Sequence, residues 1–394
     1  MKTIPIPYYT STLDLHVDEA NLKAVVTAKM HEYKADKSEE QLVLDALEHP
    51  IGTPRLRELA KGKKKVVLVT SDHTGLHRAT TEDEQRHMFG DAIVDNEKIA
   101  INNAFDPSQF VHMCTLPSGA DFNVNRLATE CDLLVTEGFI EPHFFAGFSG
   151  GRKSILPGIC SQETVNENHS YKAIASPYSN TGILEHNPIH EDMLYAARKV
   201  NVQFIFNVAL DGKKKIIAAW AGDLEQAHAE GVAFIRKWSQ CPSVTGDIVV
   251  TSNGGYPLDQ NLYQSPKAVA TAEACAGENG VIIMCCSCAD GMGGTHFEKL
   301  ITMGSVDEID SYLSKIPPKE TIPEQWCPQI YARILKKHPV ILVTTYLNHD
   351  EVRRANMIPA STPDEALQIA YSMKGRDASV VVIPDGVSVL AVKE

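Results

Sequence analysis

The sequence has no apolar run long enough to cross a bilayer, which takes about 20 residues. Its longest runs, such as Val66–Thr70 and Val281–Cys286, are far shorter. The first ten residues lack the apolar core of a secretory signal, so we expect a cytoplasmic protein without a membrane partner. Positive charge is also scarce, because 50 acidic residues outnumber 37 Lys and Arg. The net charge of −13 argues against nucleic acid as a partner but allows one local basic pocket for an anion.

The number of cysteines and the overall composition exclude further classes of protein. Nine cysteines, odd in number and irregularly spaced, do not form the pattern of a disulfide framework, so we expect reduced thiols. Hydrophobic residues make up 43% of the chain, which excludes a disordered protein. The length of 394 residues predicts two domains, or three, at roughly 100–200 residues per domain.

Short apolar runs separated by helical patterns recur along the chain. The runs are continuous rather than alternating, as in strands buried on both faces of a parallel sheet. Strands that alternate with helices predict an α/β fold. The expected strands are Lys65–Thr70, Cys131–Thr136, Val202–Val208, Asp247–Ser252, Gly280–Cys285, Val340–Thr345 and Ser379–Pro384. The expected helices are Glu191–Lys199, Asp223–Trp238, Pro266–Cys275 and Pro328–Lys337.

We predict two domains, each with a largely parallel sheet flanked by helices, and an active site in the interdomain cleft. The boundary falls in Ser239–Asp247, which is rich in Pro, Gly and small polar residues. Residues 1–240 would form the N-terminal domain and residues 245–394 the C-terminal domain that closes over the substrate. The last strand is the one element that could return to the first domain.

The most informative segment follows the expected strand Cys131–Thr136, where ligands bind in open α/β sheets. Residues 147–154, GFSGGRKS, combine glycines that let backbone approach an anion with two cations. A P-loop anchored at Lys153 would need glycine where Arg152 stands, which argues against an NTPase. A phosphate site and a flexible turn with a solvated basic pair both remain open.

Individual residues in this segment allow catalytic and structural interpretations. Lys153, among glycines and apolar residues, is either a desolvated nucleophile and covalent anchor, or a phosphate-binding or exposed lysine. His143 and His169 suit acid–base work or metal ligation, although a lone histidine is more often structural.

A second cluster follows the expected strand Asp247–Ser252. Gln264 and Lys267 are three residues apart, so a helix start would put them on one face, where they could hold a carboxylate or a carbonyl. A helix cap with an exposed lysine is the competing interpretation. Cys285, Cys286 and Cys288 are expected to be buried small residues rather than metal ligands.

Taken together, these segments resemble the nickel-dependent lactate racemase family over nearly the whole chain. The matching blocks are SDHT at Ser71–Thr74, GLHRATTEDE at Gly75–Glu84, EPHFFAGFSGGRKSILPG at Glu141–Gly158, NENHS at Asn166–Ser170, NGGYPLDQNLYQSPK at Asn253–Lys267, DGMGGTHF at Asp290–Phe297 and QWCPQIYARIL at Gln325–Leu335.

The resemblance implies an isomerase, a racemase or epimerase of a small anionic 2-hydroxy acid such as lactate. Its cofactor would be nickel held in a pyridinium-3-thioamide-5-thiocarboxylic acid mononucleotide, the nickel-pincer nucleotide, so cofactor-synthesis enzymes are implied partners. The substrate would pass through a 2-keto acid by hydride transfer to and from the cofactor. A sugar-acid or other hydroxy-acid epimerase, or a degenerate cofactor-binding member without turnover, is the alternative.

The residue roles are implied in the same way. The cofactor would be tethered to Lys153, and His169 would complete the nickel coordination. The acid–base pair would be His77 and His143. The substrate would meet Gln264, Lys267 and Tyr263. The cofactor's phosphate and ribose would be lined by Asp72, Thr74, Gly150, Gly151 and Arg152.

One departure from the family pattern lies between Thr74 and Gly75. In the family, SDHT continues into Arg-Pro, and a helix and a strand precede the G-x-H-R motif, whereas here Thr74 runs directly into GLHR. A segment of about thirty residues, the size of one helix and one strand, is therefore expected to be absent. The family's substrate-binding arginine would be absent with it.

Overall fold

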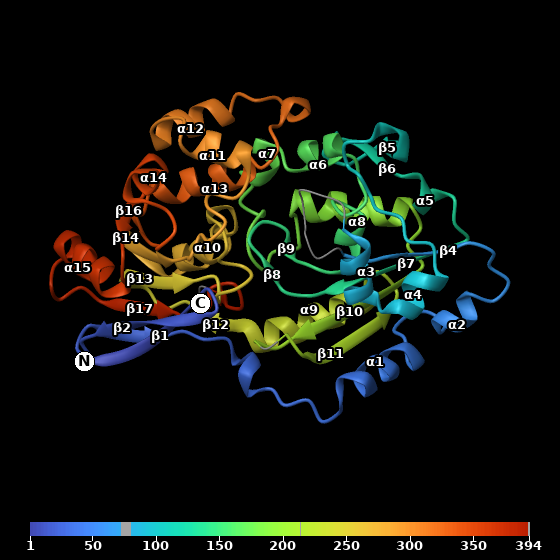
Figure 1. The fold of residues 1–394 in the computed structure, drawn as a ribbon, viewed down its shortest axis with the longest axis horizontal. Helices are drawn as coiled ribbons and strands as arrows, with labels where there is room; N and C mark the ends of the chain where they lie inside the picture. Colours follow the sequence, from blue (N-terminus) through green and yellow to red (C-terminus); the bar gives the residue numbers. More distant parts are fainter. Residues whose placement is uncertain (72–79, 213, 393–394) are drawn as a thin grey trace.

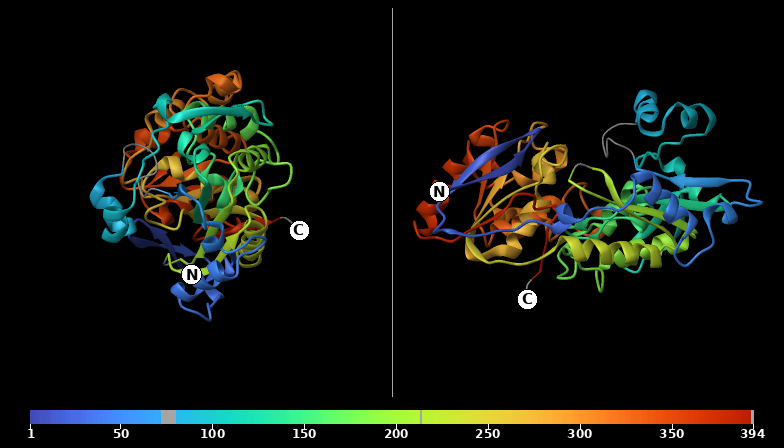
Figure 2. Two further views of the ribbon diagram at one scale, coloured as in Figure 1. Left: turned by 90° about the vertical axis from the view of Figure 1, so that its right-hand side faces the viewer. Right: turned by 90° about the horizontal axis from the view of Figure 1, so that it is seen from below.

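Two mainly parallel sheets, one in each half of the molecule, form the framework of the fold (Figure 1). The computed structural model describes residues 1–71, 80–212 and 214–392. The two halves lie side by side along the long axis, with helices on their outer faces (Figure 2). This arrangement confirms the predicted α/β class with two sheet-and-helix domains.

The N-terminal sheet has the order β11-β10-β7-β4. Its central strand β7 (Leu133–Phe139) pairs in parallel with β4 (Val66–Val69) and with β10 (Phe204–Leu210), while β11 (Ile216–Gly222) is antiparallel to β10. The start of β7 is buried on both faces, as its continuous apolar run predicts. Helices α1 (Glu39–Glu48), α8 (Pro188–Lys199) and α9 (Gln226–Ser239) flank this sheet.

The C-terminal sheet is parallel throughout, in the order β16-β15-β14-β13-β17-β3. Its alternate side chains face two different layers of the core. One face packs against α10 (Pro266–Cys275) and α13 (Trp326–Leu335), and the other against α15 (Pro363–Lys374). The strands are β3 (Leu22–Val25), β13 (Gly246–Ser252), β14 (Ala276–Cys285), β15 (Val340–Val343), β16 (Ile358–Ala360) and β17 (Val380–Ile383).

The remaining helices and strands are shorter and connect or cover the two sheets. They are α2 (Leu56–Leu59), α3 (Glu82–Phe89), α4 (Asp91–Asn96), β5 (Phe110–Thr115), β6 (Asp121–Asn125), α5 (Arg126–Thr129), β8 (Pro142–His143), β9 (Gly147–Phe148), α6 (Gln162–Asn168), α7 (Tyr171–Ile174), α11 (Thr295–Ile301), α12 (Val306–Leu313) and α14 (His349–Arg354). Within the described ranges, none of the helices has both the length and the apolar character that a membrane span requires.

The chain's first strands pack on the C-terminal sheet and not on the sheet of the N-terminal half. The hairpin of β1 (Lys2–Tyr8) and β2 (Ser11–Val17) packs against the C-terminal sheet, and β3 extends that sheet beside β17. These residues were assigned to the domain 1–240, but their buried apolar side chains need a sheet face, which the C-terminal strands supply. At the other end, β18 (Leu390–Val392) pairs with β12 (Gln240–Pro242) at the junction of the two halves.

Strand β4 lies at the edge of the N-terminal sheet. Within the part of the chain that the structure describes, its only strand partner is β7. Its outward-facing side chains Val66 and Leu68 are 50% and 59% exposed. Apolar residues at the free edge of a parallel sheet are unusual, since such sheets normally have both faces covered.

Candidate active site

The loop that follows β7 turns back through the short antiparallel strands β8 and β9 and is built on tightly packed glycines. A Cβ atom at Gly147, where φ is +77°, would lie 2.3 Å from the Ile183 carbonyl oxygen. One at Gly150, where φ is +91°, would lie 2.8 Å from Ile140 Cγ1. Both positions therefore need glycine, for conformation as well as for space. The loop then enters a 3₁₀ helix, Gly151–Ser154, that carries Lys153.

Lys153 sits in a partly buried, positively charged environment. Burial first, and then the charges of Arg152 and Lys267, lower the pKa of Lys153 to about 7, against a smaller opposing effect of Glu141. Its Nζ lies over the Phe145 ring, 5.9 Å from the centroid. Near neutral pH a large fraction of this amine is therefore unprotonated and nucleophilic.

The lowered pKa of Lys153 predicts a stability effect in the apo protein. Between about pH 7 and the ordinary lysine value of 10.5, the unfolded chain binds a proton at Lys153 that the folded chain does not. The free energy of unfolding should therefore rise with pH across that window, by up to about 1.4 kcal/mol per pH unit. In urea denaturation at pH 7, 8 and 9, Lys153→Met should lose this slope, whereas the exposed-lysine variant Lys172→Met should keep it. Equal slopes in the two variants would contradict the lowered pKa.

Two histidines flank Lys153 in space. His143 is part of β8, and its Nδ1 accepts the backbone N–H groups of Phe145 and Ala146, at 3.5 and 3.3 Å. Burial, together with the charges of Lys153 and Lys267, holds the pKa of His143 well below its usual range. His143 is therefore a neutral imidazole at pH 7, the form that can accept a proton.

His169 directly follows α6 and is 3% exposed. Its Nδ1 donates to the Val165 carbonyl oxygen at 3.0 Å. Burial first, and then the charge of Lys153, lower the pKa of His169 to about 3, so the ring is neutral and Nε2 keeps its lone pair. An imidazole fixed through one nitrogen with the other one unprotonated is the usual form of a histidine metal ligand.

The C-terminal domain completes the site from the other side. Tyr263 and Gln264 belong to the 3₁₀ helix Leu262–Gln264, and Lys267 lies in the first turn of α10. The charge of Lys267 contributes to the lowered pKa values of His143 and Lys153, which places it near both. The segments that were singled out from the sequence therefore meet at the junction of the two domains.

One aromatic side chain, Trp326, joins the halves of the site and was given no role from the sequence. Trp326, at the start of α13, donates from its indole N–H to the Tyr263 hydroxyl at 3.0 Å. Its ring lies 4.8 Å from the His169 ring, which in turn lies 5.1 Å from Phe145. Trp326 stands in the QWCPQIYARIL block, but only the folded chain shows that it contacts His169.

The residues predicted to line the cofactor's phosphate and ribose, and the predicted base His77, lie in three different situations. Gly150 and Gly151 form the turn that leads to Lys153. Arg152 is 1% exposed, and its N–H groups are all bonded to protein acceptors, which leaves none for a phosphate. Asp72, Thr74 and His77, as well as the junction between Thr74 and Gly75, lie outside the described residues.

The cysteines occupy the positions expected of them. All nine are free thiols, and Cys285, Cys286 and Cys288 are fully buried. Across the described residues, no group of three or more His, Cys, Asp or Glu is arranged to hold a metal ion by itself. A nickel ion at this site would therefore need ligands from a bound cofactor in addition to His169.

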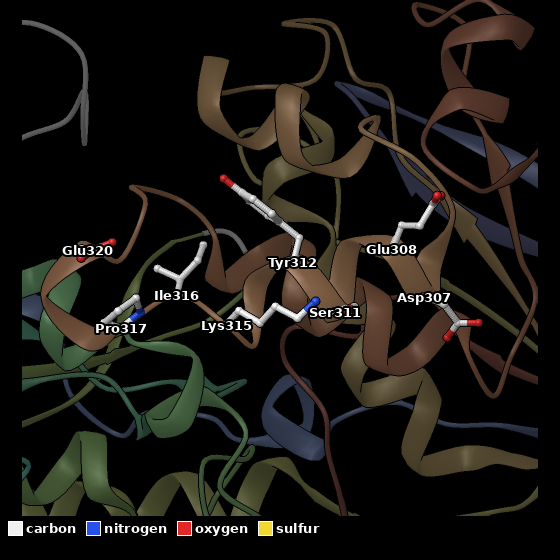
Figure 3. Close-up of a pocket in the computed structure, with 8 residues that line it drawn as sticks. All are labelled: Asp307, Glu308, Ser311, Tyr312, Lys315, Ile316, Pro317 and Glu320. Carbon is white, nitrogen blue, oxygen red and sulfur yellow. The ribbon is translucent and has the colours of Figure 1, made fainter.

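An open hollow lies elsewhere on the C-terminal domain, lined by side chains of α12 and the following segment, between Asp307 and Glu320 (Figure 3). None of the predicted catalytic, cofactor-binding or substrate-binding residues lines it. It is therefore separate from the site at the domain junction.

The chain is similar to known lactate racemases in both of its domains. The model of the lactate racemase C-terminal domain matches residues 241–391, and that of the N-terminal domain matches residues 8–74 and 73–182. Lactate racemases from Thermoanaerobacterium thermosaccharolyticum and Lactiplantibacillus plantarum are 44% and 42% identical, each over 99% of this chain and 99% and 100% of their own lengths.

Solved structures show the same fold. The lactate racemase apoprotein from T. thermosaccharolyticum superposes with a TM-score of 0.95 at 43% identity, over 100% of both chains. A protein from Thermotoga maritima superposes with a TM-score of 0.66 at 19% identity, over 92% of this chain and 100% of its own, and supports the fold alone.

The alignments also bear on the junction after Thr74. The alignment with the T. thermosaccharolyticum protein spans 423 positions, 29 more than the 394 residues of this chain. The N-terminal family model matches in two pieces that meet at residues 73–74. The similarity nevertheless extends from one end of the chain to the other, and the chain belongs to the lactate racemase family, a family of isomerases.

Proposed function

We propose that this protein racemises a small 2-hydroxy acid, with lactate as the first substrate to test, by means of a nickel-pincer nucleotide attached to Lys153. The observation that carries the proposal is the joint placement of four groups at the domain junction: an amine with a pKa near 7, two neutral imidazoles and a second lysine. The names of the T. thermosaccharolyticum and L. plantarum relatives supply the substrate.

The residues present fit such a cofactor. The unprotonated amine of Lys153 could form the thioamide tether, and His169 Nε2, which carries a free lone pair, could bind nickel. When bound, the nickel-pincer nucleotide would supply a centre that takes the hydrogen on substrate C2 with its electron pair and returns it. The protein's part is to position the substrate and to handle the accompanying proton.

His143 suits the role of the proton acceptor. A 2-hydroxy acid becomes a 2-keto acid when C2 loses hydrogen with an electron pair and the hydroxyl group loses a proton. His143 is neutral at pH 7, and its unprotonated nitrogen is Nδ1, which accepts long bonds from the backbone N–H groups of Phe145 and Ala146. His143 would therefore take up the proton, and return it, at Nδ1 by giving up these two bonds. The second base for the opposite enantiomer is assigned to His77 by family resemblance alone.

Substrate binding is assigned to the C-terminal domain. Lys267 is the cation available for the substrate carboxylate, and Gln264 and Tyr263 belong to the same turn. A substrate carboxylate beside Lys267 would offset the charge of Lys267, since Lys153 carries no charge once it forms the tether.

The direct test is chiral analysis of the protein loaded with cofactor. Incubation with pure L-lactate, and separately with pure D-lactate, should give the same mixture of both enantiomers from either side. A panel of other 2-hydroxy acids and sugar acids tests the alternative of an epimerase with another substrate. A cofactor adduct on Lys153 without turnover of any panel member would favour a degenerate family member and refute the racemase.

The proposal also concerns cofactor supply and cellular location. The cofactor-synthesis enzymes of the host are the expected partners, because the cofactor has to be made before it can be attached to Lys153. The nine free thiols favour a reducing compartment, and we propose the cytoplasm. Intact mass of protein expressed with and without those enzymes should differ by one adduct.

A further inference from the structure

Arg152, the residue before the proposed cofactor tether, is bonded entirely within the protein. Its Nη1 donates to the carbonyl oxygens of Ser149 and Gly150 at 3.2 and 3.1 Å, and its Nη2 to those of Ala146 and Phe148 at 3.2 and 2.8 Å. Four carbonyl groups from five consecutive residues thus converge on one guanidinium group. A planar fork of five donors is suited to fixing such a curved backbone segment.

The fifth donor of Arg152 reaches a different element. Its Nε donates to His190 Nδ1 on α8 at 2.9 Å, which requires that this nitrogen be unprotonated. His228 on α9 donates from Nε2 to the Ser149 carbonyl oxygen at 2.9 Å. Burial lowers the pKa values of both histidines to about 3, so both remain neutral beside the cation. The loop is thereby attached to two helices.

The loop that Arg152 organises separates two groups of the proposed site. His143 lies immediately before it and accepts the backbone N–H of Ala146, whereas Lys153 lies immediately after it. Among the described residues, no carboxylate forms an ion pair with Arg152, so its charge is offset only by uncharged acceptors, the four carbonyl oxygens and His190 Nδ1. A buried cation retained without a counter-charge has a large desolvation cost, which simple loop packing would not require.

From this geometry we infer that Arg152 is a positioning residue, and not a phosphate ligand: it holds the 146–150 loop so that His143 and Lys153 keep a fixed relation. The expected loss of turnover rests on the proposed function, whereas the expected loosening of the loop does not. It predicts that loss of the guanidinium fork loosens this loop and misplaces the amine and the imidazole while leaving the rest of the fold intact.

The experiment compares Arg152→Lys with Arg236→Lys. Arg236 is a matched control, because its guanidinium packs over the Phe148 ring of the same loop, 5.0 Å from the centroid. Within the described residues its hydrogen bond goes to the Gly182 carbonyl oxygen and to none of the carbonyl oxygens of residues 146–150. In the apo proteins, hydrogen exchange at amides 146–151 should be faster by about tenfold in Arg152→Lys and unchanged in Arg236→Lys. Acetylation of Lys153 by acetic anhydride, followed by mass spectrometry against pH, should have its midpoint near 7 in the wild type and a higher midpoint in Arg152→Lys.

The loaded enzymes provide a second readout. Arg152→Lys should lower kcat for lactate by roughly 10²-fold, the cost of a small misplacement of reacting groups, while KM changes little because Lys267 binds the carboxylate from the other domain. Wild-type exchange rates and an unchanged acetylation midpoint in Arg152→Lys would overturn the inference. If the wild type does not turn over lactate, the proposed function fails, but the two apo measurements still decide this one.

A second variant covers the case in which Arg152→Lys does not fold. His190→Leu removes only the acceptor of the Arg152 Nε–H group and should produce a smaller increase in exchange over the same amides. Exchange at 146–151 equal to that of the wild type in a folded His190→Leu would count against the proposed attachment to α8.

Discussion

Replacing Lys153 by alanine is expected to abolish both the cofactor adduct and racemisation. The reason is chemical: at the domain junction this amine is the group whose pKa is lowered to about 7 and which can therefore act as a nucleophile at neutral pH. His169 alone would hold nickel weakly, since no other His, Cys, Asp or Glu cluster in the described ranges could support it. The measurement is the intact mass of the purified protein, followed by the chiral lactate assay.

The matched control is Lys172→Ala, an exposed lysine on the nearby helix α7, which should keep full adduct and activity. Lys153→Arg adds a second comparison, because it restores positive charge but offers no neutral amine at this pH. If Lys153→Arg or Lys153→Ala still carried the adduct, the tether would be elsewhere. If both lost the adduct but racemised lactate, the cofactor would not be needed for turnover.

Much of the parallel framework could be predicted because buried parallel strands are continuous apolar runs. The predicted helix Pro266–Cys275 matches α10 residue for residue, and the strand at Val340 begins where expected. Strand β3 was not predicted to join the C-terminal sheet, nor the hairpin β1–β2 to pack on it, because local pattern shows that an apolar strand needs a partner or a cover but not which of two distant sheets supplies it. Strand β11 was not predicted, although IIAAWAG is a continuous apolar run; it is the antiparallel partner of β10.

In the site, too, the sequence predicted which residues matter but not how their side chains are directed. Residue type and spacing pointed to Lys153, His143, His169 and Lys267, all of which meet at the domain junction. The direction of the Arg152 side chain could not be predicted, because a cation beside glycines suits a phosphate and a ring of carbonyl oxygens equally well. Only the fold shows that those carbonyl groups surround it.

The second large effect is expected from an insertion between Thr74 and Gly75. The edge of β4 is free within the described residues, Val66 and Leu68 are exposed on it, and the N-terminal family model breaks at residues 73–74. Introducing the corresponding segment of the T. thermosaccharolyticum protein should add a strand beside β4. Covering the two half-exposed side chains should stabilise the protein by about 1 kcal/mol each.

Activity should rise together with stability. Family resemblance places a substrate-binding arginine in the absent segment, and a hydrogen bond to a charged group contributes roughly 1.5–3 kcal/mol. The expected gain in kcat/KM for lactate is therefore about 10–10²-fold. A glycine–serine insert of the same length is the control and should change neither urea stability nor turnover, since it brings no apolar face and no arginine.

A coupled substitution decides whether the inserted segment pairs with β4 in particular. In the present chain Leu68→Glu should change the free energy of unfolding by less than about 0.5 kcal/mol, because the side chain is 59% exposed. In the inserted chain the same substitution should cost at least about 2 kcal/mol, because the added strand and its helix would cover the sheet face on which residue 68 lies and bury the carboxylate there. Equal costs in the two backgrounds would mean that the segment adds its activity, if any, without completing this edge of the sheet.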